Sequence, residues 1–494
     1  MKLLNSNSYS FAGDGRLSSK RGNALITVLV MIVFLGGLTT VSIKDSLHAY
    51  KLAKRQHILD QVLYAAEAGI EEAARKLNSE KYYGMTPVVF VHELSEDLEA
   101  TVTMTPLDAQ SQNFRLTSVS TMDGISRTVT VEKATRPTYM EYGLYFEDFN
   151  NLWWIAGSIT DGKVWTGTTQ SISGASLANG EKEGPIFRDV NETLSGSFGG
   201  TPEYASYLSP DITLDEYEYS DLRFWSDYSE GYRTEVSKPA LASVDFDEIA
   251  NASNALSVTV EDISVDDVSY DDIPTHGAII LKGPTEIRFD VVTVGDQEVG
   301  IVAIKNKDAF GNASWHELYS ESLDVIVVND DLTTNNKNEV DGTVTISESS
   351  DPSILKGNLA IVSTQDTTIK GDIIYNDQAL ETSGDKLLIA SKENIYIDRT
   401  DKNDMILQAG LMAAGLNSSG YIGLKDYDKY GVRGNLYFTG SMIGGKVYPF
   451  GNFSFTEGML NGYKTHRFYD TRFLTDPPPF TPSLSNEIQF SGWH

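Results

Sequence analysis

The chain has 494 residues and no cysteine, and its 69 acidic residues against 39 basic ones give a formal net charge of −30 at pH 7. The lack of cysteine excludes disulfides, thiolate metal sites and a cysteine nucleophile. Stability must therefore come from a sizeable hydrophobic core, and this length predicts more than one domain. The excess of negative charge excludes nucleic acid as a partner and is typical of a solvated, exported protein.

An apolar segment lies near the start of the chain. Residues 23–43 carry no charge and directly follow Lys20 and Arg21. As a helix they span roughly 32 Å, close to the ~30 Å hydrocarbon core of a bilayer, so the segment can cross once. Because basic residues predominate before it, the N-terminus is expected in the cytoplasm. We therefore expect a single-pass protein of the bacterial cytoplasmic membrane, with most of the chain outside the cytoplasm. The segment could also be an uncleaved signal anchor.

The helical pattern continues past the apolar segment, and we expect one long helix over residues 23–83. Apolar residues recur at spacings of three and four, which predicts a stripe that covers a globular domain. The members of this stripe are Leu52, Leu59, Leu63, Ala66, Ile70, Ala73 and Leu77.

The N-terminal region resembles the PilX-type minor pilins and the K-type pseudopilins over roughly the first eighty residues. The resemblance rests on Arg21-Gly22, on the run NALITVLVMIVFLGG that follows, and on AAEAGIEEA at 65–73. It implies that a prepilin peptidase removes residues 1–22 by cleaving after Gly22 and methylates Asn23. It also implies a type IV pilus or secretion filament, in which the helix packs against other pilins and minor pilins.

Two positions depart from the usual pilin pattern. The first mature residue is Asn23 where most pilins have phenylalanine, and the fifth is Thr27 where most carry a glutamate that pairs with a neighbour's N-terminus. Within the family, the missing glutamate at Thr27 implies a capping position at the filament tip or weak incorporation.

Residues 84–135 are predicted to form a small antiparallel sheet that packs on the second half of the helix. Four runs rich in Val, Thr and Ile follow one another there. Asp123-Gly124 separates the last two runs, and this dipeptide accepts the positive φ values of a tight hairpin turn.

Residues 136–480 contain many short apolar runs with Gly, Asn or Asp between them. Several runs are apolar on consecutive residues, as expected of strands that surround a dry interior. The pattern predicts a mainly β protein with a large β-helix or solenoid-like domain, and a β-sandwich is the alternative. Residues 481–494 are expected to be a C-terminal tail.

This region resembles the exported β-rich domain of uncharacterised bacterial pilus-associated proteins with PilX-like N-termini. The resemblance rests on a few short motifs, which lie at 157–159, 162–166, 426–428, 434–436, 440–443, 462–463, 469–472 and 477–480. The last of these contains three consecutive prolines, which cannot donate ladder hydrogen bonds and therefore end a strand.

An acidic and aromatic stretch at about 200–275 is expected to be an insertion in this domain. Its composition fits a cationic partner, calcium or a host or surface glycan, but a solvated loop region with local packing is the favoured interpretation. Structural calcium has no supporting motif. The loop that begins at Asp426 has Tyr430 and Tyr437 where an EF-hand needs an oxygen ligand and a glutamate, and no cofactor is expected.

No catalytic constellation is evident. The pairs Asp266-Asp267 and Asp271-Asp272 point to opposite faces if they lie on strands, and His316-Glu317 is not followed by a second histidine. We therefore expect no enzyme. The expected function is a surface-displayed structural or adhesive subunit, similar to a minor pilin, at or near a filament tip. A membrane-anchored, polysaccharide-active β-helix enzyme and a secretion-system pseudopilin are the alternatives.

Overall fold

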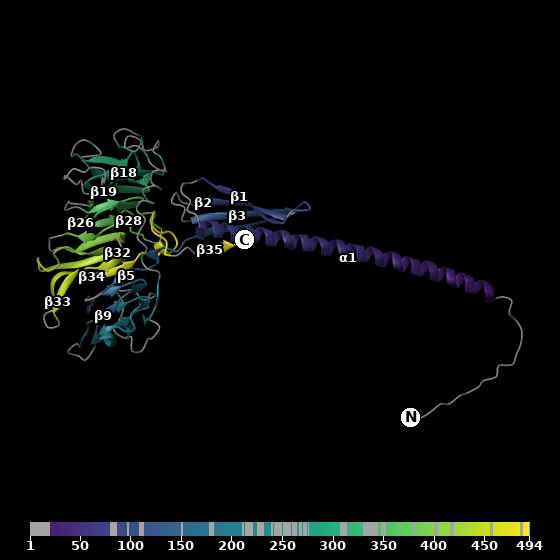
Figure 1. Ribbon diagram of the computed structural model, residues 1–494, viewed down its shortest axis with the longest axis horizontal. Helices are drawn as coiled ribbons and strands as arrows, with labels where there is room; N and C mark the ends of the chain where they lie inside the picture. The colour runs from purple at the N-terminus through teal and green to yellow at the C-terminus, as the bar shows by residue number, and fades with distance from the viewer. Residues whose placement is uncertain are drawn as a thin grey trace, which may run out of the picture. The chain divides into compact units, whose positions relative to one another are not determined.

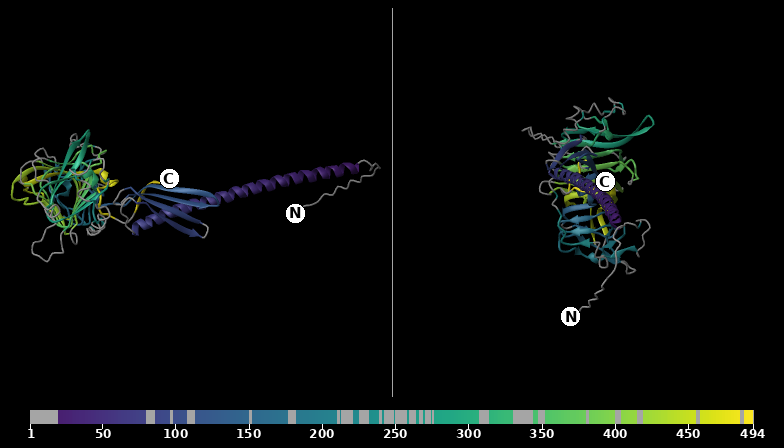
Figure 2. Two further views of the ribbon diagram at one scale, coloured as in Figure 1. Left: turned by 90° about the horizontal axis from the view of Figure 1, so that it is seen from above. Right: turned by 90° about the vertical axis from the view of Figure 1, so that its right-hand side faces the viewer.

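The protein is mainly β, with one long N-terminal helix, a small antiparallel sheet and a large curled sheet rich in parallel pairs (Figure 1, Figure 2). This is the predicted fold class. The computed structural model describes residues 20–79, 86–95, 98–107, 113–149, 152–176, 182–209, 212, 221–224, 232–238, 241, 249, 258, 264–265, 269, 274, 276–306, 314–329, 344–346, 352–379, 382–399, 404–414, 419–454, 458–484 and 488–493.

Helix α1 spans Lys20–Ser79 without interruption. Its first buried side chain is Ile58, and the predicted stripe is confirmed at Ala66, Ile70, Ala73 and Leu77. The prediction is wrong at Leu52 and Leu63, which are 55% and 38% exposed. Leu52 precedes the buried face, which begins at Ile58, and next to Leu63 the buried face is formed by Val62 and Ala65.

Small residues explain this shift of the buried face. A Cβ at Gly69 would lie 2.3 Å from Ser118 Oγ and 2.9 Å from Val102 Cγ2, so the sheet approaches the helix backbone closely at this point. The face of α1 that packs is therefore selected by close approach at Ala65, Ala66 and Gly69, rather than by the largest side chains.

Four of the sheet's strands follow the helix, as predicted: β1 (Val88–Ser95), β2 (Leu98–Pro106), β3 (Asn113–Met122) and β4 (Ile125–Thr135). The β3–β4 turn has φ of 52° at Asp123 and 74° at Gly124, which confirms the hairpin. A fifth strand, β35 (Gln489–Trp493), pairs antiparallel with β4. It comes from the segment that was predicted to be a tail.

The large sheet contains three parallel runs of strands, which we call stacks. The first stack follows the order β18 (Ala278–Lys282), β22 (Val325–Asn329), β25 (Asn358–Ser363), β28 (Lys386–Ser391), β30 (Met405–Ala413), β32 (Val432–Val447), β5 (Leu144–Asp148), β8 (Val164–Thr166), β13 (Asn191–Thr193) and β17 (Tyr232–Arg233). Since β-sandwiches are built from antiparallel sheets, this parallel order favours the solenoid-like prediction over its alternative.

The second stack follows the order β24 (Ser353–Leu355), β27 (Ile373–Tyr375), β30, β32, β34 (Gly458–Tyr469), β7 (Ile159–Thr160), β12 (Ile186–Phe187) and β15 (Ser206–Tyr207). The third follows β19 (Thr285–Val294), β23 (Val344–Ile346), β26 (Thr367–Ile369), β29 (Ile395–Ile397), β31 (Tyr421–Leu424) and the end of β32. Strands β30 and β32 are long enough to belong to more than one stack, so the sheet curls.

The remaining elements are short or lie beside the stacks. They are β6 (Trp153–Trp154), β9 (Ser171–Ile172), β10 (Ala175–Ser176), β11 (Lys182–Glu183), β14 (Gly199–Gly200), β16 (Arg223–Phe224), β20 (Gln297–Lys305), β21 (His316–Tyr319), β33 (Gly451–Ser454) and the 3₁₀ turns η1 (Tyr139–Glu141), η2 (Pro202–Tyr204), η5 (Ser320–Ser322) and η7 (Thr471–Leu474).

The strands of the first stack are out of chain order. Strand β5 lies in the middle, beside β32, and the chain passes from β17 at one end of the stack to β18 at the other (Figure 1). In the intervening acidic segment, the Val236 amide donates to a β13 carbonyl at 3.0 Å, the Leu241 amide to the Glu147 carboxylate, and the Val258 amide to a β18 carbonyl at 3.1 Å. Three described residues of the expected insertion thus hydrogen-bond to β5, β13 and β18 of the stack.

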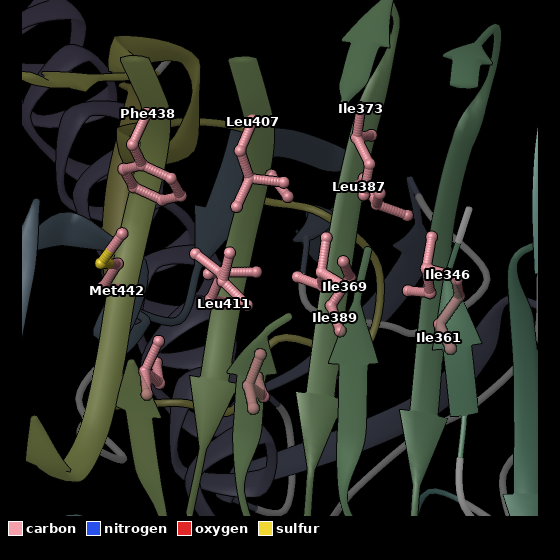
Figure 3. Close-up of a cluster of buried hydrophobic side chains, with 14 of the residues drawn as sticks. Ile346, Ile361, Ile369, Ile373, Leu387, Ile389, Leu407, Leu411, Phe438 and Met442 are labelled. Atoms are coloured by element: carbon pink, nitrogen blue, oxygen red, sulfur yellow. The ribbon is translucent and has the colours of Figure 1, made fainter. Parts of the chain in front are cut away.

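Ladders of apolar side chains fill the interior of the large sheet. Ile361, Ile389, Leu411 and Met442 are successive register partners and lie in one row across neighbouring strands (Figure 3). All four are fully buried. Such aligned rows supply the hydrophobic core that a chain without cysteine needs.

Candidate functional site: the exposed apolar helix

The N-terminal part of α1 presents its apolar side chains outward on every side. All residues from 24 to 57 are exposed, and among them Leu29 is 62% and Phe34 65% exposed. Within the described residues, this is the helix that is long and apolar enough to cross a bilayer, and none of its most apolar stretch is buried. A helix that is apolar all round is suited to lipid or to a bundle of other apolar helices.

Two hydroxyl groups of this segment form hydrogen bonds within the helix. Thr39 Oγ1 donates to the Leu35 carbonyl at 2.9 Å, and Thr40 Oγ1 donates to the Gly36 carbonyl at 2.7 Å. An unsatisfied hydroxyl is costly in an apolar environment, and bonds to the preceding turn avoid that cost. Thr39 and Thr40 therefore add no unpaired hydroxyl group to the apolar surface.

The three predicted processing and assembly residues lie on this helix. Gly22 and Asn23 fall in the first turn of α1, and Thr27 follows one turn later in the exposed segment. The rest of the predicted leader, residues 1–19, lies outside the described residues. The cleavage and methylation at Gly22 and Asn23, and the role of Thr27, stay predictions.

The other candidates from the sequence show no metal or catalytic geometry. Asp426 pairs with Lys429 at 2.5 Å, and the hydrogen bond from that lysine lowers the pKa of Asp426. His316 lies on β21, while both Asp-Asp pairs fall outside the described residues. Across the described residues, no three His, Cys, Asp or Glu side chains are grouped so that they could hold a metal ion.

The motifs of the second resemblance meet where β5, β7 and β8 join β32 and β34. Ser441 Oγ donates to the Tyr142 carbonyl, and Tyr469 Oη donates to the Met140 carbonyl at 2.7 Å. Fully buried Asp470 accepts two bonds from the Arg472 guanidinium, at 2.6 and 2.9 Å, and Arg472 Nη1 also donates to the Ser383 carbonyl at 2.7 Å. These motif residues therefore hold together parts of the chain that are far apart in sequence.

Comparisons with known proteins add little to this geometry. No family model matches the chain, and no curated protein matches it. Among solved structures, it is similar to the crystal structure of the competence-associated pilin ComZ from Thermus thermophilus, with 11% sequence identity and a TM-score of 0.29. The match covers 89% of this chain and 97% of that chain. Values this low do not establish a shared fold.

Proposed function

We propose that the protein is a pilin-like subunit that is anchored in the cytoplasmic membrane by α1 and displayed at or near the tip of a filament. The observation that carries this proposal is the division of one continuous helix at Ile58. Residues 24–57 are exposed, with an uncharged apolar run up to Ile43, and from Ile58 onward the helix buries one face on a small sheet. Each large apolar side chain gains about 1.5–3 kcal/mol on leaving water, so the first part needs lipid or other helices around it.

The proposed maturation follows from the resemblance of the N-terminus to pilins. A prepilin peptidase removes residues 1–22, and the helix that begins at Asn23 then leaves the bilayer to pack against other pilins. Thr27 offers no carboxylate to the N-terminus of a neighbouring subunit. A subunit at the tip needs no such pair above it, which favours the capping position.

The two alternatives differ in what the large sheet is for. A secretion pseudopilin needs only a compact head, whereas the large sheet gives a filament subunit reach and surface. A polysaccharide-active enzyme needs two carboxylates around one bond, and the Asp-Asp pairs considered for that role lie outside the described residues. An adhesive role rests on fold-level analogy.

Photo-cross-linking in the native cell tests the proposal. A photoreactive phenylalanine derivative replaces Leu38, which is 51% exposed in the apolar segment, and in a second strain it replaces Tyr430, which is 42% exposed on the β-rich part. We expect adducts to small helical pilins from position 38 and none from position 430. If position 38 yields no protein adduct in cells that carry filaments, the helix is only a membrane anchor and the filament role is wrong.

A further inference from the structure

A cavity of about 720 Å³ opens in the large sheet near the β5–β32 junction. Its lining includes Phe149, Trp153 and Trp154 from the segment that follows β5, together with Tyr421 and Tyr448. Its volume is within the range of roughly 300–1,000 Å³ that is typical of small-molecule sites. Neither the helix nor the proposed filament role accounts for it.

Arg467 on β34 lines this cavity without a carboxylate partner. Its Nε atom has no exposed surface and no hydrogen-bond partner, and no acidic side chain among the described residues pairs with the guanidinium. The guanidinium lies 5.3 Å from the ring centre of Trp154 and 5.4 Å from that of Phe450. Burial lowers the pKa of Arg467 to about 10, which leaves it charged at neutral pH.

A partly buried cation without a carboxylate partner is unfavourable unless something compensates it. Contacts with aromatic faces stabilise a cation less than the loss of its hydration destabilises it. Arg472 is compensated in the usual way, because its guanidinium donates two hydrogen bonds to the carboxylate of Asp470. Arg467 has no such partner, and the planar guanidinium matches a carboxylate that enters the cavity.

The rest of the lining suits a sugar ring. Tyr421 and Tyr448 stack with their ring centres 5.1 Å apart, and Tyr448 and Trp153 remain 44% and 39% exposed. Flat aromatic faces of this kind pack against the apolar C–H face of a pyranose. Ser158, Ser419, Asn452 and Thr465 also line the cavity and provide partners for hydroxyl groups.

The overall charge of the protein would not attract an anion to this cavity. The chain carries a net charge of −30, so its long-range field repels a negative ligand. The second cation of the cavity, Lys446, already lies 4.0 Å from Asp148. Binding of an anion here must therefore depend on the local Arg467 and on stacking.

We propose that this cavity binds a carboxylated sugar, such as a uronic acid unit of an acidic glycan. The carboxylate pairs with Arg467, and the ring lies against Tyr448 and Trp153. The site is contained in the large sheet, so ligand binding is independent of whether α1 enters a filament.

Thermal shift and calorimetric titration of the full chain in detergent test this proposal. The probes are glucuronate, galacturonate and their short oligomers, with glucose, galactose and inorganic phosphate as comparisons. We expect a uronate to bind at least about tenfold more tightly than the neutral sugar of the same ring, because hydrogen bonds to a charged partner are lost without the carboxylate. If no uronate binds, or if neutral sugars bind equally, the proposal is overturned; equal binding of phosphate would show an oxyanion site that does not recognise sugars.

Variants separate ligand recognition from packing. Arg467→Met keeps the length of the side chain between the two aromatic rings and is expected to lose at least tenfold in uronate affinity. Trp153→Ala removes a stacking face, while Trp493→Ala, at a 45% exposed position on β35, is the matched control and should bind normally. If Arg467→Met does not fold, the uronate affinity of Trp153→Ala still tests whether the ligand binds in this cavity. Unchanged affinity in either cavity variant would contradict the assigned site.

Discussion

Leu144 and Met442 are register partners on the adjacent parallel strands β5 and β32, although they lie at opposite ends of the β-rich part of the chain. Both are buried, at 3% and 0% exposure. Through this pair, β5, the first strand of the large sheet in chain order, joins β32, its longest described strand. The two halves therefore form one continuous stack, whose completion must await synthesis of residues beyond 442.

Truncation of the Met442 side chain tests how much the packing between β5 and β32 contributes to the stability of the fold. Met442→Ala should lower the free energy of unfolding by about 2–5 kcal/mol, because it leaves a cavity in a fully buried ladder. Urea denaturation measures the change. Leu460→Ala, at a 40% exposed position, is the control and should change the value by less than about 0.5 kcal/mol. Equal effects of the two substitutions would show that the junction is not tightly packed.

The close approach at Gly69 predicts a steric effect on the small sheet. Gly69→Ala places a Cβ against Ser118 and Val102, so overpacking should cost about 1–3 kcal/mol and exceed the helix propensity gained. Thermal unfolding of the purified protein measures it. Gly36→Ala is the control on the same helix, because a Cβ there has nothing within 4 Å. A stabilised Gly69→Ala protein would mean that the helix and sheet do not approach this closely.

Thr27 predicts a change in filament position. In the proposed role, Thr27→Glu supplies the carboxylate that pairs with the N-terminus of the next subunit. The variant should therefore be incorporated along the filament in place of the tip, with several-fold more protein in sheared filaments. Thr27→Gln has nearly the same size without the charge and should behave as the wild type. Equal amounts of both variants in the filament fraction would show that the fifth mature position does not limit incorporation.

His466 predicts a pH dependence of stability. Burial, together with the nearby Lys464 and Arg467, lowers the pKa of His466 below its ordinary value of 6.5, and its ring stacks on Tyr437. The unfolded chain then binds a proton more readily than the folded one. The neutral imidazole of His466 therefore contributes fully to stability above about pH 6.5. This contribution is lost as the pH falls from there toward the lower pKa of the folded state.

The measurement compares urea midpoints at pH 7.5 and 5.5 for the wild type and His466→Gln. The wild type should lose more stability on acidification than the variant, which has no imidazole to protonate. If the two proteins respond identically, the imidazole titrates alike in the folded and unfolded chain, and the pKa of His466 is not lowered by the fold.

Local signals in the sequence account for much of the fold. The uncharged run at 23–43 gives the exposed helix, and the Asp123-Gly124 turn with alternating strands gives the small antiparallel sheet. Consecutive apolar residues in short runs predict the solenoid-like sheet, because strands buried on both sides need no alternation. Each of these features is set by neighbours in the chain, so the sequence displays it directly.

Features that depend on distant pairing leave no such signal. Strand β35 is five residues long, and its partner β4 lies at the other end of the chain, so its residues resemble a tail. The same holds for the pairing of Leu144 with Met442. Arg467 was not singled out because its significance comes from a missing carboxylate, which only the folded neighbourhood can show. The stripe was misplaced at Leu63 because size was weighted above the close approach that Gly69 permits.

N-terminal mass spectrometry of the protein purified from its native membrane tests the central claim most directly. The account predicts a mature chain that begins at Asn23 and carries one added methyl group, while Gly22→Ala should leave the full-length precursor. An intact Met1 in the wild-type protein from assembled filaments, or normal processing of Gly22→Ala, would contradict the account. The apolar helix would then be an ordinary membrane anchor for a surface protein.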